Sequence, residues 1–151
     1  MEEARQLVDV GQDAFGREAQ LAEDAAVAWA AMRRGAEREG VRLLLLSGFR
    51  SIEGQAEIVQ KKLSAGQPLE AILRVSAYPG FREHHTGRAI DLGSPTCAHF
   101  SEAFGATREF DWLSQRAPQF GFTLSYPRGN PQGVVFEPWH WCLWEKAGRE
   151  P

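Results

Sequence analysis

The sequence predicts an α+β domain in which helices flank a small, mainly antiparallel sheet. Apolar residues recur at helical spacing early in the chain, and short apolar runs bounded by glycines follow. Two strand-like segments joined by a turn-rich stretch come near the end. Helices and strands therefore mix without the regular alternation of a doubly wound parallel sheet. A chain of 151 residues with 43% hydrophobic residues is expected to form one domain over 1–151.

The first expected element is a long amphipathic helix from about residue 14 to residue 39. Apolar residues recur there every three or four positions, and Gly40 then ends the run. The segment 41–47 (VRLLLLS) is short, apolar and bounded by Gly40 and Gly48. These bounds favour a buried strand over a second helix.

The middle of the chain predicts two further helices, a loop and a strand. Residues 51–66 begin with a serine that can cap a helix, and 68–75 carry a proline in the first turn. Residues 76–87 contain Pro, Gly and Ser and predict a loop that carries two adjacent histidines. The segment 88–94 (RAIDLGS) alternates in the manner of a strand, with Asp91 on one face.

The last third of the chain predicts a helix and two strands. The segment 107–121 predicts a helix that ends at Pro118. Strands are expected at 122–126 and 134–144, joined by the turn-rich segment 127–133.

Bulk properties exclude several classes of function. The net charge of −3 gives no basic surface of the kind that nucleic acid requires, and no apolar run reaches the roughly 20 residues of a spanning helix. We therefore expect neither a nucleic-acid partner nor a membrane span, and we expect a monomer. Cys97 and Cys142 are too few for a disulfide framework. The acidic start lacks a secretory signal, so the expected location is cytoplasmic, or periplasmic or cell-wall associated if a leader was removed.

Four side chains with metal-binding or acid–base chemistry lie at loop or strand ends: one of the two adjacent histidines, Asp91, Glu137 and His140. A catalytic zinc takes three nitrogen or oxygen ligands from the protein and keeps a fourth position open. Two histidines and Asp91 fit that count. A further carboxylate nearby can move a proton between water and a leaving group.

The alternation of an ideal strand separates two of these groups. His140 and Cys142 would share one face, whereas Glu137 and Trp139 would share the other. Pro138 cannot donate to a neighbouring strand and often marks an edge or a bulge. A shared site for Glu137 and His140 therefore requires a local irregularity at Pro138.

Each residue also has a structural interpretation without chemistry. A histidine such as His85 is most simply a solvated loop residue. A carboxylate in an apolar strand needs a partner, and Asp91 has Arg88 and Arg50 as candidates besides a metal. Glu137 can simply begin an edge strand.

Three segments resemble the motifs of one enzyme family, in order. SGFRS at 47–51, followed by Gln55, resembles S-G-[FY]-R-S-x-x-x-Q; YPGFREHHTGRAIDLG at 78–93 resembles P-G-x-S-x-H-x-x-G-x-A-x-D; and EPWHW at 137–141 resembles E-P-W-H. The chain is thereby similar to the D-Ala-D-Ala carboxypeptidase (VanY-like) branch of the LAS zinc peptidases, which include lysostaphin-type enzymes and the sonic hedgehog domain. The resemblance covers about 21–144 and implies a hedgehog/DD-peptidase-like fold.

The resemblance implies a role for each group of the site. Its histidine stands seven residues before the aspartate, which selects His84 and not His85. By this match His84, Asp91 and His140 would hold Zn²⁺, and Glu137 would be the general base.

Substrate contacts are also implied by the resemblance. Arg50 would face the scissile carbonyl oxygen, where a planar donor fork stabilises developing negative charge. Gln55, Ser51 and Arg82 would contact the substrate. Two positions depart from the family pattern: Arg82 stands where a serine is usual, and Val134 stands where a tyrosine is frequent.

The function that follows is a zinc-dependent metallopeptidase that hydrolyses peptidoglycan stem peptides at a C-terminal D-amino acid. An endolysin-like endopeptidase or a D,D-dipeptidase would use the same site. A metal-retaining binding module without catalysis is the alternative from another class. Glu137 and Arg50 argue against that module, because a binder needs neither a base nor an oxyanion donor.

Overall fold

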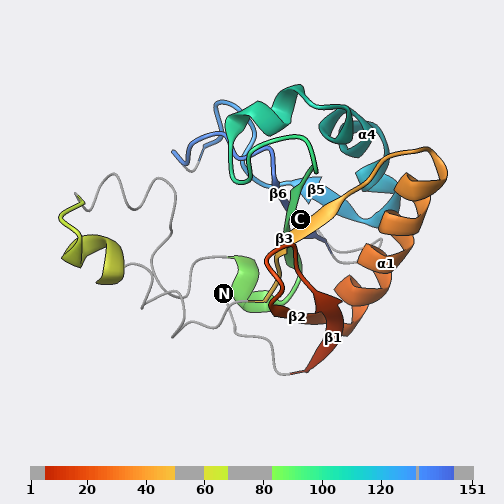
Figure 1. Ribbon diagram of the computed structural model, residues 1–151, viewed down its shortest axis with the longest axis horizontal. Helices are drawn as coiled ribbons and strands as arrows, with labels where there is room; N and C mark the ends of the chain where they lie inside the picture. The colour runs from red at the N-terminus through yellow and green to blue at the C-terminus, as the bar shows by residue number, and fades with distance from the viewer. Residues whose placement is uncertain (1–5, 50–59, 68–82, 132, 145–151) are drawn as a thin grey trace.

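The computed structural model describes residues 6–49, 60–67, 83–131 and 133–144, and its framework is two antiparallel sheets. A two-stranded sheet contains β1 (Leu7–Gln12) and β2 (Glu18–Ala22). A four-stranded sheet has the order β3-β4-β6-β5, with bounds Leu44–Ser47, Ala89–Gly93, His140–Leu143 and Phe122–Leu124. All neighbouring pairs are antiparallel, which confirms the predicted class (Figure 1).

The hairpin of β1 and β2 replaces the first half of the long helix that was expected from residue 14, so that prediction was wrong for 14–22. Ala19 and Leu21 are both buried, whereas Glu18 and Gln20 are exposed. This period of two belongs to a strand with one face on the core.

Asp13 closes the hairpin. Its carboxylate accepts hydrogen bonds from the backbone N–H groups of Phe15 (2.8 Å) and Arg17 (3.0 Å) and from the Arg17 guanidinium (2.8 Å). Burial raises the pKa of Asp13, but these hydrogen bonds and the charge of Arg17 together lower it more, to a net value below 3.8.

Helix α1 (Glu23–Arg38) begins directly after β2 and confirms the second half of the predicted helix. Its first turn carries acidic residues and its last turn Arg38, which complements the helix dipole. Gly40, at φ +75°, takes the left-handed conformation that ends helices. Buried residues recur every three or four positions, namely Ala25, Trp29, Met32 and Ala36.

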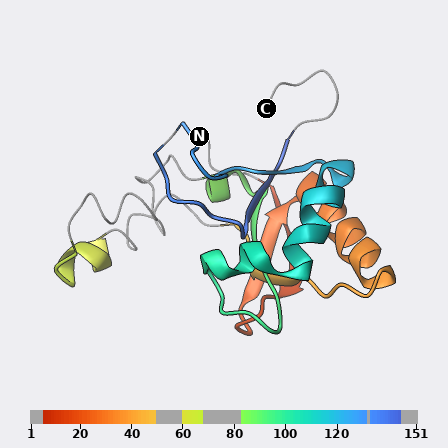
Figure 2. The ribbon, with the colours of Figure 1, turned by 90° about the horizontal axis from the view of Figure 1, so that it is seen from above.

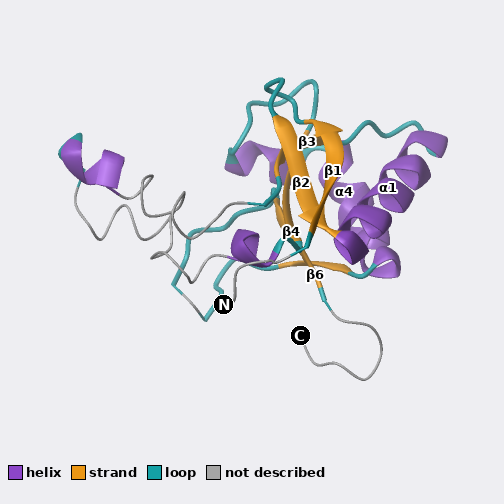
Figure 3. Cartoon of the chain, turned by 90° about the horizontal axis from the view of Figure 1, so that it is seen from below, coloured by secondary structure: helices purple, strands orange, loops and turns teal. Residues whose placement is uncertain are grey.

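Helix α4 (Arg108–Arg116) lies beside α1, on the same side of the strands (Figures 2 and 3). The Thr107 hydroxyl caps it by accepting a hydrogen bond from the Phe110 N–H at 3.2 Å. The indole of Trp112 donates to Glu39 at 2.9 Å and joins the two helices. The predicted end at Pro118 falls within the 3₁₀ helix η3 (Ala117–Phe120), which follows α4 directly.

The other expected elements are confirmed in part. The strand at 41–47 is confirmed for 44–47 and the strand at 88–94 for 89–93, whereas only 122–124 of 122–126 and 140–143 of 134–144 are strand. Residues 60–64 of the helix expected at 51–66 are helical, and its remainder before residue 60 lies outside the described residues, as does the helix expected at 68–75. Two further 3₁₀ helices are η1 (Glu83–Thr86) and η2 (Glu102–Ala106).

The core lies between the strands and the two long helices. It contains Leu21 from β2, Met32 from α1, Ile90 and Leu92 from β4, and Leu113 from α4, each fully buried. All five residues of β4 are buried. Within the described part of the chain, no helix has the length and apolar character needed to cross a bilayer. Cys97 and Cys142 are free thiols.

Candidate metal centre

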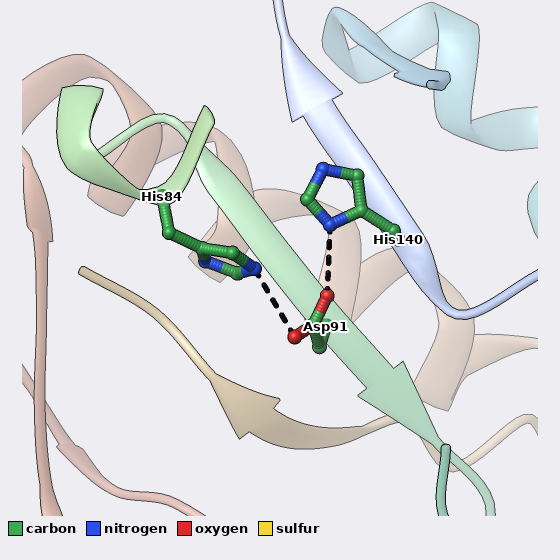
Figure 4. Close-up of side chains that lie close together, drawn as sticks. All are labelled: His84, Asp91 and His140. Atoms are coloured by element: carbon green, nitrogen blue, oxygen red, sulfur yellow. Dashed lines mark hydrogen bonds and ion pairs between the residues drawn. The ribbon is translucent and has the colours of Figure 1, made fainter. Parts of the chain in front are cut away.

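Three predicted ligands meet at the middle of the four-stranded sheet. Asp91 is the central residue of β4, and His140 is the first residue of β6. The two residues lie directly opposite each other in the β4–β6 pair, so neighbouring strands place their side chains together. His84 comes from η1, and Figure 4 shows its ring and the ring of His140 on either side of the Asp91 carboxylate.

The side chains of this cluster are in close contact and are buried. His84 Nε2 lies 3.1 Å from Asp91 Oδ2, and His140 Nδ1 lies 3.0 Å from Asp91 Oδ1. The two imidazole rings are 4.9 Å apart between centroids. Both histidines are fully buried, and Asp91 is 2% exposed.

The tautomer of His84 follows from its second nitrogen. Nδ1 lies 2.6 Å from the carbonyl oxygen of Gly48, in a buried position. A carbonyl oxygen only accepts, so Nδ1 must carry the proton and donate. Nε2 is then the nitrogen of His84 that can bind a metal, and it is directed at Asp91.

Asp91 is held as a carboxylate. Burial raises its pKa, because a charge in a dry site is costly. The electrostatic attraction of His84 and the hydrogen bond from His140 outweigh burial, and the net pKa lies well below 3.8. Asp91 therefore supplies an anionic oxygen between two imidazole nitrogens.

Gly87 explains how η1 can present His84 just before β4. Its φ of +73° is the left-handed conformation that favours glycine. A side-chain carbon at this position would lie 2.8 Å from the backbone nitrogen of Ala22, so there is no room for one. The Gly87 carbonyl accepts a hydrogen bond from that same Ala22 N–H at 2.8 Å.

A turn before β6 is an irregularity of the kind that a shared site for Glu137 and His140 requires. The His140 N–H donates to the Glu137 carbonyl at 3.2 Å, across Pro138 and Trp139. Strand alternation consequently does not apply between Glu137 and His140, and both side chains are fully buried. Because β6 lies between β4 and β5, Glu137 does not begin an edge strand.

The segment before Glu137 is anchored on both sides. The Glu137 N–H donates to the Tyr126 carbonyl at 3.0 Å. Within the loop, the Asn130 amide donates to the carbonyls of Pro127 (3.0 Å) and Val134 (2.7 Å) and accepts from the Val134 N–H (3.1 Å). Asn130 thus links the two sides of the loop that leads into Glu137.

The remaining predicted site residues, Arg50, Ser51, Gln55 and Arg82, lie outside the described residues. Arg88, one alternative partner for Asp91, pairs with Asp24 instead.

Two contacts of the site were not predicted. The Gly48 carbonyl acts through the backbone, which leaves no sequence signal. The Tyr126 ring lies 5.1 Å from the His140 ring, centroid to centroid, and its position in the SYP segment was the available signal.

The donor set fits a zinc ion. One atom from each of His84, Asp91 and His140 lies within 4.8 Å of the other two. Ligands of a tetrahedral zinc at about 2.0–2.1 Å stand about 3.3 Å apart. His84 Nε2 lies 3.1 Å from one oxygen of Asp91 and His140 Nδ1 lies 3.0 Å from the other, which is close to that separation. Two nitrogens and one anionic oxygen leave a fourth position for water or substrate.

Comparisons with known proteins point to one family. The model of the VanY family, described as D-alanyl-D-alanine carboxypeptidase, matches residues 18–146. The chain is 36% identical over 124 residues to the putative carboxypeptidase YodJ of Bacillus subtilis (strain 168), which covers 80% of this chain and 45% of YodJ. It spans between 36% and 53% of the length of the curated relatives that it matches.

Solved structures share the fold. The L,D-carboxypeptidase LdcB superposes with a TM-score of 0.83 at 30% identity, over 93% of this chain and 69% of that chain. A mutant of the vancomycin-resistance D,D-pentapeptidase VanY, solved in complex with Zn(II), superposes with a TM-score of 0.71 at 24% identity, over 95% of this chain and 86% of that chain. With a family match that covers most of its length and the predicted α+β fold in place, this chain belongs to the VanY family of D-alanyl-D-alanine carboxypeptidases.

Proposed function

We propose that this chain is a zinc-dependent carboxypeptidase that removes a C-terminal D-amino acid from peptidoglycan stem peptides. The observation that carries the proposal is the buried cluster of His84, Asp91 and His140, whose ligand atoms lie within 4.8 Å of one another. The family match and the Zn(II) complex of a VanY enzyme support the choice of metal and of reaction.

In this proposal His84 and His140 supply nitrogen ligands and Asp91 supplies an oxygen. When bound, zinc would polarise the scissile carbonyl and lower the pKa of a coordinated water. The charge on Asp91 offsets part of the charge of the cation in a buried site, where an uncompensated ion is costly.

Glu137 is assigned as the general base. Its carboxylate takes a proton from the attacking water and later delivers that proton to the departing amine. Its full burial and its place on the turn that ends at His140 support this role. Arg50 is assigned, from its motif, as the donor to the carbonyl oxygen on which negative charge develops.

Substrate contacts are assigned from the motifs as well. Ser51 and Gln55 follow Arg50 and would position the peptide, whereas Arg82 would donate to its terminal carboxylate in place of a hydroxyl. Val134 lacks the hydroxyl of the tyrosine that is frequent at this position in the family. These two departures bear on which terminal residue is removed.

A second candidate reaction is L,D-carboxypeptidase activity at the same centre. The similarity to LdcB, with a TM-score of 0.83 at 30% identity, favours it. The two reactions differ in the residue before the scissile bond, which is a D-amino acid in one case and an L-amino acid in the other.

One experiment separates these activities. Purified protein is incubated with stem peptides that end in D-Ala-D-Ala and with peptides that end in an L-residue followed by D-Ala, with and without a chelator, and products are read by mass. Loss of one D-Ala from the first set supports D,D-activity, and loss from the second supports L,D-activity. Cleavage inside the stem or of free D-Ala-D-Ala would indicate the endopeptidase or the dipeptidase. Zinc binding without cleavage of any substrate would favour a binding module and overturn the proposal.

The products also bear on where the protein acts. Stem peptides attached to glycan are met in the periplasm or at the cell wall, whereas a free dipeptide is met in the cytoplasm. Because one chain supplies all three ligands, we propose that the monomer is the active unit.

A further inference from the structure

We propose that strand β2 is the positioning element of the metal centre, and that it acts on His84 through the peptide group between Gly48 and Phe49. This inference builds on the proposed function, because it concerns how the chain orients one ligand of the proposed zinc site. The element that does so comes from the hairpin, more than 60 residues before the ligand.

The peptide group between Gly48 and Phe49 bridges β2 and His84. On one side, the Phe49 N–H donates to the Gln20 carbonyl at 2.8 Å. On the other side, the Gly48 carbonyl accepts from His84 Nδ1 at 2.6 Å. A single peptide plane therefore continues a hydrogen-bonded chain from β2 to the imidazole, and bonds in such a chain polarise one another.

Gly48 allows this peptide to lie against β2. A side-chain carbon at Gly48 would stand 2.8 Å from the Gln20 carbonyl oxygen and 3.1 Å from the Leu21 side chain. The first of these contacts is with backbone, which cannot rotate away. Any larger residue must therefore move the Gly48 carbonyl, the acceptor that sets the His84 ring.

The same edge of β2 also forms a hydrogen bond with the turn that follows His84. Gln20 and Ala22 are two residues apart, so their backbone groups point to the same side of the strand. The Ala22 N–H donates to the Gly87 carbonyl at 2.8 Å, and the Gly87 N–H donates to the His84 carbonyl at 3.3 Å. β2 thus contacts the acceptor of the imidazole and the backbone that carries it.

The consequence for the metal is specific. With Nδ1 bound to a fixed acceptor, His84 is held in one tautomer and one ring orientation, and Nε2 is directed at the cluster. A positioning contact of this type typically contributes 10- to 100-fold to metal affinity.

The test compares Gly48→Ala with Gly35→Ala. Gly35 lies in α1, and a side-chain carbon there would also be crowded, though less severely, at 3.1 Å from the Phe120 ring, on elements that contribute no ligand. Zinc affinity is measured by competition with a chromophoric chelator, and folding by circular dichroism. We expect Gly48→Ala to bind zinc about 10- to 100-fold more weakly and Gly35→Ala to match the wild type.

A second measurement needs no substitution. Long-range ¹H–¹⁵N spectra of the zinc-free wild-type protein report which nitrogen of each imidazole is protonated, with the exposed His99 as the internal reference. We expect a protonated Nδ1 in His84. This readout still decides the question if Gly48→Ala does not fold.

The outcomes separate the two proposals. A wild-type protein that binds no zinc would overturn the proposed function. Zinc binding that Gly48→Ala leaves unchanged, or a His84 protonated only at Nε2, would overturn the positioning role of β2 and leave the zinc site in place.

Discussion

Replacement of Asp91 by asparagine is expected to remove most of the stabilisation that zinc gives the fold. The three ligands are buried, and His140 lies 49 residues beyond Asp91, so an unfolded chain does not hold them together. Zinc would therefore bind the folded state, and its binding energy would add to the free energy of unfolding. At a zinc concentration of 100 times Kd this gain is about 2.7 kcal/mol.

The expected shift in melting temperature follows from chain length. For a domain of this size, 1 kcal/mol corresponds to about 2–4 °C, so zinc should raise the Tm of the wild type by about 5–11 °C. In Asp91→Asn, a neutral amide replaces the carboxylate that faces both imidazoles. The site would then lose its anionic oxygen ligand. A loss of affinity of about 100-fold or more leaves at most about 0.4 kcal/mol, or roughly 1–2 °C.

The assay is a thermal melt of wild type and Asp91→Asn with chelator and with the same zinc concentration. Asp111→Asn makes the same chemical change at an exposed position of α4 and is the matched control. An Asp91→Asn protein that gains as much from zinc as the wild type would refute the reasoning, because the metal would then bind elsewhere.

Three further changes test other parts of the structure. Glu137→Gln should fold and keep the zinc-dependent rise in Tm yet lose about 10²- to 10⁴-fold in hydrolysis; near-normal turnover, measured by product mass, would exclude a general base. Asn130→Ala removes the contacts that join the two sides of the loop before Glu137, so kcat should fall while zinc affinity stays constant, and an unchanged kcat would show that the loop needs no such link. Since the folded pKa of Asp13 is lowered, its stabilising effect is present above the unfolded pKa and is lost as pH falls through the folded pKa. The difference in unfolding free energy between wild type and Asp13→Asn should therefore shrink in denaturant titrations below about pH 4, and a difference that is constant with pH would contradict this.

The grouping of the three candidate ligands was the most predictable part of the site. An aspartate within an apolar strand needs a partner, and that requirement pointed to Asp91 before its neighbours were known. The irregularity required at Pro138 is a turn that ends at His140. Local residue chemistry was sufficient for Asp91, whereas the turn was required by the hypothesis of a shared site and not predicted by strand alternation.

The hairpin was not predicted because its pattern overlaps with that of the helix behind it. Leu21 fits the apolar face of a helix together with Ala25, yet it also alternates with Ala19 as a strand residue. The choice depends on what the backbone of β2 contacts, and those contacts lie far along the chain, at Phe49 and Gly87. Such partners are backbone groups and cannot be read from side-chain patterns.

Strand β4 is buried along its whole length between β3 and β6, so it contributes both to the core and, through Asp91, to the candidate metal centre. Variation there is doubly constrained, because a change that alters Asp91 or its neighbours also disturbs packing. Residues 127–131 and 133–136, in the loop before Glu137, are partly or fully exposed, so packing constrains them less. Evolution or engineering can therefore change substrate preference through substitutions in surface loops while the ligand residues of the candidate metal centre stay the same.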